Sequence, residues 1–344
     1  MSQTLRITDK RVLDSFSGSD PDIGALWELC VHLEWDRAKA VEGISAWLGE
    51  PGGQRILDCA CGSGFPGIDL AARGYEVTCS DGSEAMIGHF QRNAALTGSL
   101  VEPVHARWQE LPDRFGTASF DVILLRGCSL LYAGTWDENA EPDRAAMTDA
   151  VEKIVTCLRP GGRFYVDTAL AANLARLEPQ HTRRPVMEIG SDIVEQDETI
   201  YTDPHRRIRT WHSRLTVNGR EYNFERRSHH VTHDELVQLL EQAGLADVQE
   251  EHVPGESYTV FTGRRPVSLR GTGRRQHPAI GQARAAFPSV SGAAFPWRFS
   301  CVRDPPLARC GLRSTVCGSR SRGDVGDLGA LLGHLLEGLR VLVQ

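Results

Sequence analysis

The chain has very little lysine: Lys10, Lys39 and Lys153 are its three lysines, against 38 basic residues in all. None of them follows a tyrosine at the Tyr-x-x-x-Lys spacing, so the sequence offers no such pair for the hydride chemistry of an NAD-dependent oxidoreductase. Long apolar runs are missing too, because no stretch approaches the ~20 residues that a membrane-spanning helix needs. Residues 1–16 lack the apolar centre of a signal peptide. We therefore expect a soluble enzyme with no membrane partner.

Metal-ligand spacing is also absent from the sequence. The chain holds nine cysteines, and the Cys59-x-Cys61 pair has no second pair at the spacing of a zinc site. His229, His230 and His233 cluster before an expected helix, but no carboxylate completes a ligand set, so we expect them to face solvent and to bind no metal. Most cysteines fall in expected strands or helices, which favours buried free thiols and a reducing, cytoplasmic location. These cysteines are Cys30, Cys59, Cys61, Cys79, Cys128 and Cys157.

Charge is distributed unevenly along the chain. Residues 267–344 carry eleven arginines and four acids, which leaves a balance of −14 on residues 1–266 within a total of −7. A body that acidic is a poor partner for a phosphate backbone, so we expect no nucleic-acid substrate. Residues 267–344 are also rich in Arg, Gly and Pro with little periodicity, which predicts a disordered tail.

The most informative stretch is RILDCACGSGFPG, residues 55–67. Its first apolar residues predict a short buried strand, Gly62 and Gly64 predict a tight loop, and residues 65–72 predict the start of a helix. A second strand is expected over residues 75–80. Glycine in such a loop lets the backbone approach a ligand closely.

Asp81 stands at the carboxyl end of the second strand, where an acid accepts hydrogen bonds from ribose hydroxyls. The pattern therefore indicates a site for an adenosine-containing cofactor. Gly62, Gly64 and Gly67 also fit G-x-G-x-x-G, which alone is a weak sign of a dinucleotide site. Asp58, four residues before the first glycine, favours a ligand with an ammonium or sulfonium charge and would repel a pyrophosphate.

Further landmarks continue the alternation of strands and helices. Residues 120–133 are expected to begin as a buried strand, and an amphipathic helix then runs to residue 158. LRPGG at residues 158–162 ends that helix, and residues 163–169 form the next strand. In this order, and with DCACGSG at residues 58–64, they resemble a class I S-adenosylmethionine-dependent methyltransferase. The resemblance implies S-adenosyl-L-methionine as the cofactor. It also implies a Rossmann-like, doubly wound, seven-stranded α/β sheet with a β-rich insertion over the active site.

Five segments are expected along the chain. The insertion carries hairpin signals at Asp203-Pro204 and Asn218-Gly219, and Thr232 forms a capping box with Glu235 before the last helix. The segments are residues 1–50, a helical part that covers the cofactor; 51–169, the cofactor-binding core; 170–231, a β-rich roof over the substrate; 232–266, the final helix and edge hairpin; and 267–344, the tail.

Residues 27–265 resemble, more narrowly, the glycine and sarcosine N-methyltransferase group. The similarity is carried by WELCVHLEWDR (27–37), EVTCSDGSEAM (76–86), ARW (106–108), FDVILLRGCS (120–129) and a stretch at 191–211. The resemblance implies that Arg37 binds the cofactor's carboxylate, that Asp81 holds the ribose, and that Arg107 and Trp108 flank the adenine. The family usually has asparagine where Arg107 stands. The implied cofactor site comprises Trp27, Arg37, Asp58, Ala60, Gly62, Gly64, Asp81, Gly82, Ser83, Met86, Arg107, Trp108, Arg126 and Gly127.

The substrate side departs from the glycine enzymes. Ala169 stands where an arginine clamps the carboxylate of glycine, and Ile189 and Leu215 replace tyrosines of the glycine pocket. Losing a bidentate arginine removes a strong carboxylate contact. Tyr132 maps beside the transferred methyl group and is the candidate catalytic residue, with Glu188 as a further substrate-side candidate. The replacements at Ala169, Ile189 and Leu215 predict a larger and less polar pocket.

We therefore expect N-methylation of a small-molecule amine other than glycine, by in-line methyl transfer. The sequence shows no decisive general base, which suits an amine better than a hydroxyl group. O-methylation of a secondary metabolite is the main alternative. An NAD-dependent oxidoreductase and a non-catalytic protein that keeps the cofactor fold are more distant ones. The expected partner is the small-molecule acceptor, and the sequence allows a homo-oligomer.

Overall fold

The structure of this chain is a computed structural model, and it describes residues 4–17, 20–135 and 142–267. All of them belong to one compact unit, Met1–Arg274. Apart from residue 267, the tail predicted for residues 267–344 lies outside the described residues.

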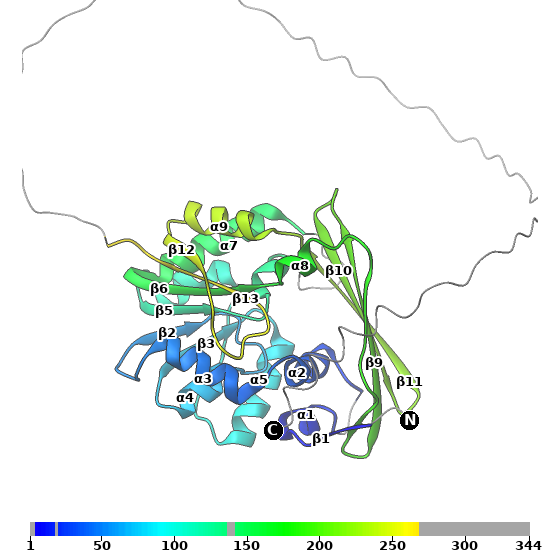
Figure 1. The fold of residues 1–344 in the computed structure, drawn as a ribbon. Helices are drawn as coiled ribbons and strands as arrows, with labels where there is room; N and C mark the ends of the chain where they lie inside the picture. Colours follow the sequence, from blue (N-terminus) through cyan, green and yellow to red (C-terminus); the bar gives the residue numbers. More distant parts are fainter. Residues whose placement is uncertain (1–3, 18–19, 136–141, 268–344) are drawn as a thin grey trace, which may run out of the picture. The chain divides into compact units, whose positions relative to one another are not determined.

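A seven-stranded sheet forms the centre of this unit (Figure 1). The strands pair in parallel except β13, which runs antiparallel to both of its neighbours. The predicted seven-stranded α/β sheet is therefore confirmed. In spatial order its strands are β12 (Ala246–Glu251), β13 (Thr259–Arg264), β6 (Leu158–Thr168), β5 (Phe120–Leu125), β2 (Arg55–Asp58), β3 (Glu76–Asp81) and β4 (Val104–His105).

Helices cover both faces of this sheet (Figure 1). Ile56 of β2 packs in one apolar cluster with α3 (Arg37–Leu48) and α4 (Gly67–Ala72), whereas Leu57 packs in another with α7 (Arg144–Cys157) and α9 (His233–Gln242). Adjacent residues of a strand point to opposite faces of the sheet. Because both faces of this sheet are buried, consecutive residues of β2 are apolar. The other helical segments are α5 (Glu84–Thr97), α6 (Leu111–Phe115), α8 (Ala171–Leu174) and the short 3₁₀ segments η1 (Trp108–Glu110) and η2 (Ser129–Tyr132).

Local signals set the ends of several helices. The predicted capping box is present at α9, where the Thr232 hydroxyl accepts from the Glu235 amide and the Glu235 carboxylate accepts from the Thr232 amide. The helix expected over residues 65–72 begins instead at Gly67, with Pro66 as its N-cap. The strand expected over residues 163–169 is longer, because β6 already begins at Leu158.

The β-rich insertion is present as a second sheet. Its antiparallel strands include the long hairpin of β10 (Ile208–Val217) and β11 (Arg220–His229), which turns at Asn218 and Gly219 with φ of 50° and 83°. Positive φ at both central residues is the signature of a type I′ hairpin turn, as the Asn-Gly pair predicts. The remaining strands of the insertion are β7 (Gln180–Arg183), β8 (Met187–Ile189) and β9 (Asp192–Asp203).

The N-terminal segment contributes a strand that the sequence did not predict. β1 (Leu5–Ile7) pairs in parallel with β8 and joins the second sheet. Three residues carry too little local pattern to predict a strand, and the pairing joins residues about 180 positions apart. The expectation of a purely helical segment over residues 1–50 is therefore wrong at its start.

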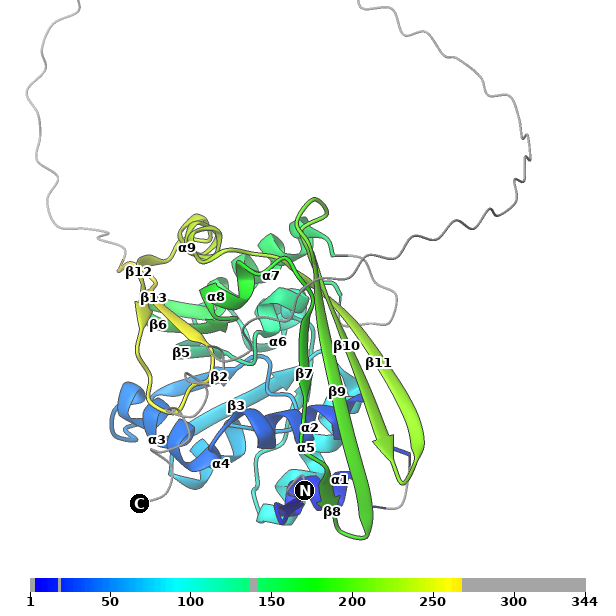
Figure 2. The ribbon, with the colours of Figure 1, turned by 45° about the vertical axis from the view of Figure 1, so that its right-hand side comes forward.

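The other N-terminal elements, α1 (Lys10–Ser15) and α2 (Ile23–Glu34), pack against the second sheet (Figure 2). Ile189 and Leu215 are 2% and 0% exposed and lie in this packed cluster. Because their side chains fill the core between helices and sheet, neither lies on the cavity wall where the sequence analysis expected them.

Within the described ranges no helix has the length and apolar character needed to cross a membrane. The longest of these helices, α5 and α7, have 14 residues each.

Candidate active site

A cavity of about 550 Å³ opens at the carboxyl ends of β2, β3 and β5. In a doubly wound sheet, ligands bind where neighbouring strands send their connections in opposite directions, and β2 lies at this point, between β3 and β5. Most of the predicted cofactor residues line this cavity. They are Trp27, Ala60, Gly62, Asp81, Gly82, Ser83, Met86, Arg107, Trp108, Arg126 and Gly127.

Asp81 at the end of β3 is held in place by the backbone. Its Oδ2 accepts a hydrogen bond from the Gly62 amide at 2.9 Å, and its Oδ1 accepts one from the Ser83 amide at 2.9 Å. Burial raises the pKa of Asp81, and the two amides counteract this rise. The result is a fixed acceptor group on the cavity wall.

Trp27 of α2 packs across two glycine-containing loops. A Cβ added at Gly62 would lie 3.3 Å from Trp27 Nε1, and one added at Gly127 would lie 3.2 Å from Trp27 Cζ2. Both glycines also have positive φ, 51° and 72°, which side chains rarely adopt. Glycine at these positions therefore lets the indole close over the cavity.

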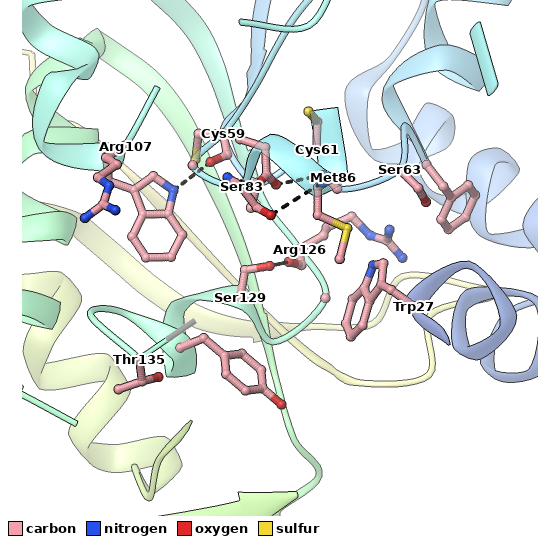
Figure 3. Close-up of a pocket in the computed structure, with 18 of the residues that line it drawn as sticks. Trp27, Cys59, Cys61, Ser63, Ser83, Met86, Arg107, Arg126, Ser129 and Thr135 are labelled. Carbon is pink, nitrogen blue, oxygen red and sulfur yellow. Dashed lines mark hydrogen bonds between the residues drawn. The ribbon is translucent and has the colours of Figure 1, made fainter. Parts of the chain in front are cut away.

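The opposite side of the cavity is formed by Arg107 and Trp108. Figure 3 shows Arg107 and Trp27 at opposite sides of the view, with Ser83 and Met86 between them. Trp108 Nε1 donates to the carbonyl oxygen of Cys59 at 2.6 Å, which fixes its ring. The indoles of Trp27 and Trp108 both line the cavity and offer apolar surfaces to a flat ligand.

Arg126 follows β5 and lines the cavity, but its charge is paired. Its Nε and Nη2 donate to the two carboxylate oxygens of Glu256 at 2.8 and 2.6 Å. Glu256 also accepts from the Tyr165 hydroxyl at 2.8 Å and from Trp35 Nε1 at 3.1 Å. Burial alone would lower the pKa of Arg126, yet the Glu256 charge outweighs it and raises the pKa.

Asp167, near the end of β6, was not predicted from the sequence to have a role. Its carboxylate accepts from the amides of Gly127 and Cys128 at 3.0 and 2.7 Å and so shapes the loop after β5. Burial raises the pKa of this carboxyl group. An acid near the end of an otherwise apolar strand is a sequence pattern from which this role of Asp167 could have been predicted. Trp35, Phe65, Ser129 and Thr135, which also line the cavity, had no such signal.

Three predicted cofactor residues lie off the cavity wall. Arg37 forms ion pairs with Glu28 and Asp9. Asp58 is 1% exposed, and burial raises its pKa to about 7 against the opposing charge of Arg126. Gly64 packs beneath the wall, since a Cβ there would lie 2.4 Å from Ile68 Cδ1.

Of the residues predicted to contact the substrate, some line the cavity and others do not. Tyr132 lines the cavity, and burial raises the pKa of its phenol. Ala169 lies in the apolar cluster below α9, 7% exposed. Glu188 pairs with exposed Arg6 at 3.3 Å, and its side chain is 39% exposed. The structure therefore brings only Tyr132 of this set to the cavity.

The predicted free thiols are confirmed, since the six cysteines named above are unpaired and buried. The expectation for the histidine cluster is wrong in part. The rings of His229, His230 and His233 each hydrogen-bond a different backbone carbonyl oxygen, at 2.9–3.0 Å, and His229 is 4% exposed. The imidazole nitrogens bond the carbonyl groups of Ala133 after η2, Leu174 at the end of α8 and Ala169 after β6, instead of facing solvent. In the described part of the chain no His, Cys, Asp and Glu side chains group as a metal site would require.

Parts of the chain are similar to known proteins. Residues 56–162 match the profile of a family described as a methyltransferase domain. The chain is 30% identical over 102 residues to the glycine/sarcosine N-methyltransferase of Aphanothece halophytica, covering 29% of this chain and 38% of that protein. It is 25% identical over 178 residues to the glycine N-methyltransferase of Rattus norvegicus, covering 48% and 57%. The chain thus spans between about two fifths and three fifths of these relatives.

Solved structures match over more of the chain. The sugar N-methyltransferase KedS8 from Streptoalloteichus is similar with a TM-score of 0.56 and 18% identity, over 73% of this chain and 97% of that one. CalS10, an amino pentose methyltransferase from Micromonospora echinaspora whose structure holds S-adenosylmethionine, is similar with a TM-score of 0.52 and 16% identity, over 72% and 100%. At these identities the similarity establishes the fold.

Proposed function

We propose that this chain is a class I S-adenosylmethionine-dependent methyltransferase and that it methylates a small-molecule amine other than glycine, with S-adenosyl-L-methionine as donor. The observation that carries the proposal is the cavity at the ends of β2, β3 and β5, with Asp81 fixed between Gly62 and Ser83. That carboxylate suits the two hydroxyls of a ribose, and the indole walls suit an adenine ring.

The buried polar groups around the cavity also fit this cofactor. Arg37 Nη1 is buried and makes no hydrogen bond within the described residues, so it can donate to a carboxylate. Its guanidinium lies 5.3 Å from the ring centre of Phe65, which lines the cavity. Both carboxylate oxygens of Asp58 are buried without hydrogen-bond partners in the same ranges, which suits a nearby ammonium charge. Arg37 and Asp58 therefore remain our candidates for the amino-acid end of the cofactor.

Methyl transfer needs mainly alignment from the protein. When bound, the cofactor would supply an electrophilic methyl carbon on a sulfonium, from which the acceptor nitrogen would displace a neutral thioether and then give up its extra proton to water. The chain's contribution is to hold the acceptor nitrogen in line, an effect worth up to about 7–11 kcal/mol. Tyr132, at the acceptor end of the cavity, is our candidate for this positioning.

The cavity wall favours an amine over a hydroxyl acceptor. Its described residues include two acids, Asp81 and Glu110, and both accept hydrogen bonds from backbone amides. No histidine is among the described residues of the cavity wall. Tyr132 stays a neutral phenol because burial raises its pKa. A hydroxyl needs a general base, whereas a neutral amine has its lone pair ready. The printed names of the KedS8 and CalS10 neighbours, a sugar N-methyltransferase and an amino pentose methyltransferase, point the same way.

The experiment is a calorimetric titration with S-adenosyl-L-methionine followed by an acceptor screen. The purified chain is incubated with the cofactor and with separate panels of amines and phenols, and products are detected by a gain of one methyl mass. We expect saturable cofactor binding and mass gain on amines. Mass gain confined to phenols would replace N-methylation by O-methylation. Failure to bind the cofactor, or tight binding of NAD instead, would overturn the proposal.

A further inference from the structure

A buried arginine of the second sheet is not used by the site described so far. Arg209 lies near the start of β10 and is 7% exposed. It shares a strand face with Ser213 and Leu215, which are 1% and 0% exposed, whereas His212 and Arg214 on the other face are exposed. Because side chains alternate along a strand, the Arg209 side chain points into the protein.

Arg209 lies beside the point where the second sheet meets η2. Its register partner on β11 is Ser228, and the next residue, His229, hydrogen-bonds the carbonyl oxygen of Ala133 at 3.0 Å. Ala133 directly follows Tyr132, which lines the cavity. Burial raises the pKa of Tyr132, and the positive charge of Arg209 acts against this rise. Arg209 is not itself among the residues that line the cavity, but the segment that carries it contacts the segment that carries Tyr132.

The Arg209 guanidinium has no hydrogen bond or ion pair within the described ranges, and its Nε is fully buried. The hydroxyl of Thr202, the register partner of Arg209 on β9, is likewise buried without a partner. Burying a charge without a counter-charge is costly, so such a group is rarely kept for stability alone. Two unsatisfied donors side by side point to an anionic ligand group.

We propose that Arg209 binds a carboxylate of the acceptor, so that the substrates are amines that also carry an acid group. This inference rests on the proposed methyl transfer. It gives the acceptor's anion a different partner from the arginine of the glycine enzymes, whose place is taken here by buried Ala169. The specificity then comes from the second sheet and not from the cofactor-binding core.

The charged residues around Arg209 indicate that its ligand group carries a single negative charge. Arg207, just before β10, is paired with Glu235. Arg226, on β11, donates to the carbonyl oxygen of Glu225 at 2.7 Å. Of these three described arginines, Arg207 and Arg226 thus have partners, whereas the Arg209 guanidinium makes no hydrogen bond or ion pair with the described residues. One guanidinium and neighbouring hydroxyls match a monoanionic carboxylate, whereas a phosphate dianion would call for further cations.

The test compares Arg209→Met with Arg209→Lys on matched acceptors, tyrosine against tyramine and phenylalanine against phenethylamine. In each pair the two compounds differ only in the carboxylate. We expect the unaltered protein to favour the acids, and Arg209→Met to lower kcat/KM for the acids by roughly 30-fold or more, the scale of a lost charge-assisted contact. Methylation of the decarboxylated amines should stay unchanged, and Arg209→Lys should retain part of the preference.

Arg214→Met is the control, because Arg214 lies on the same strand with its side chain on the exposed face. It should leave the preference for acids unchanged. The proposal is overturned if no pair shows binding or methylation that favours the acid, or if Arg209→Met affects both members of a pair alike. Cofactor titration of each variant keeps this result separate, since loss of S-adenosyl-L-methionine binding by the unaltered protein would overturn the proposed function itself.

A stability measurement distinguishes this role from a structural one. Removing an unpaired buried charge should raise the melting temperature of the ligand-free Arg209→Met protein, by at least about 2 °C for a body of this size. Tyrosine or phenylalanine, added with S-adenosylhomocysteine, should raise the melting temperature of the unaltered protein and not that of the variant. A melting temperature that falls on substitution would mean that Arg209 serves packing, which contradicts the proposal.

Discussion

Arg126 and Glu256 are 130 residues apart in the chain, yet they form a two-point ion pair at 2.8 and 2.6 Å on the cavity wall. Their side chains are 4% and 1% exposed. The pair joins the end of β5 to the loop before β13, and Tyr165 and Trp35 add hydrogen bonds to the same carboxylate. A contact between two distant parts of the sequence thereby fixes the cavity wall at Arg126.

Glu256→Gln should destabilise the protein strongly. The substitution leaves Arg126 charged and buried without its counter-charge, and breaking such a pair costs about 3–5 kcal/mol. The free energy of unfolding is measured by chemical denaturation. Arg214→Met, which breaks an exposed pair with Asp197, is the matched control and should leave it unchanged. Equal, small effects of the two substitutions would show that the buried pair carries no special weight.

Asp81→Asn should weaken the binding of S-adenosyl-L-methionine by about 1.5–3 kcal/mol, since a charged hydrogen-bond acceptor is lost. Calorimetry measures the affinity. Glu84→Gln, three residues along and 89% exposed at its side chain, serves as the control and should bind normally. Unchanged affinity in Asp81→Asn would remove Asp81 from the cofactor site.

Asp58 should make stability depend on pH in the ligand-free protein. Burial raises its pKa from 3.8 to about 7, so the folded state holds the proton more tightly than the unfolded state does. The contribution of this group to the free energy of unfolding therefore falls as the pH rises from about 4 to about 7, by at most about 1.4 kcal/mol per pH unit. Asp58→Asn should make this slope shallower in denaturation curves recorded across that range, and the part that remains comes from Asp81 and Asp167, whose pKa values burial also raises. A variant with the same slope as the unaltered protein would contradict the prediction.

Gly127→Ala should reduce both stability and cofactor affinity. Its φ of 72° strains any side chain at a cost of about 1–2 kcal/mol, and the new methyl group would meet Trp27. Gly219→Ala is the matched control, because Gly219 also has positive φ, 83°, but an added Cβ has open space around it. Both variants should lose stability in thermal melts, and only Gly127→Ala should lose affinity in calorimetry. Similar losses of affinity would mean that Trp27 does not cover the cofactor.

Glycine and sarcosine should be turned over negligibly. A compound with so few atoms has no apolar side chain to add to a carboxylate contact, and the arginine whose place Ala169 takes is missing, so Arg209 alone would have to bind it. A side-by-side assay at saturating cofactor compares them with bulkier amines, whose binding can draw on apolar area at roughly 25 cal/mol per Å². Efficient methylation of glycine would show that a carboxylate contact alone suffices for binding and that the pocket does not select bulkier acceptors.

Sequence reasoning succeeded where the determining signal is local. The strand at residues 55–58, the glycine loop and the α9 capping box each follow from neighbouring residues, because turns and caps are set within a few positions. The positions of Asp81, Trp27 and Arg107 on one cavity followed from a family resemblance that spans the same elements.

The failures concern partners that are distant along the chain. Nothing near residue 256 reveals that Glu256 binds Arg126, and nothing near residue 5 reveals that β1 pairs with β8. Ile189 and Leu215 were placed at the pocket by a loose alignment in strands that alternate, where an error of one position moves a side chain to the other face. Their burial in the core needed the three-dimensional structure.

The pairing of β1 with β8 also has a consequence for engineering. Protein designers who wish to change acceptor choice would transplant residues 170–231 as a cassette between relatives. Here that cassette would arrive without Leu5–Ile7, its parallel neighbour, and without the α1 and α2 side chains that fill the cluster beneath it. A working exchange must therefore carry two separate pieces of the chain together, residues 4–34 and residues 170–231, as a single grafting unit.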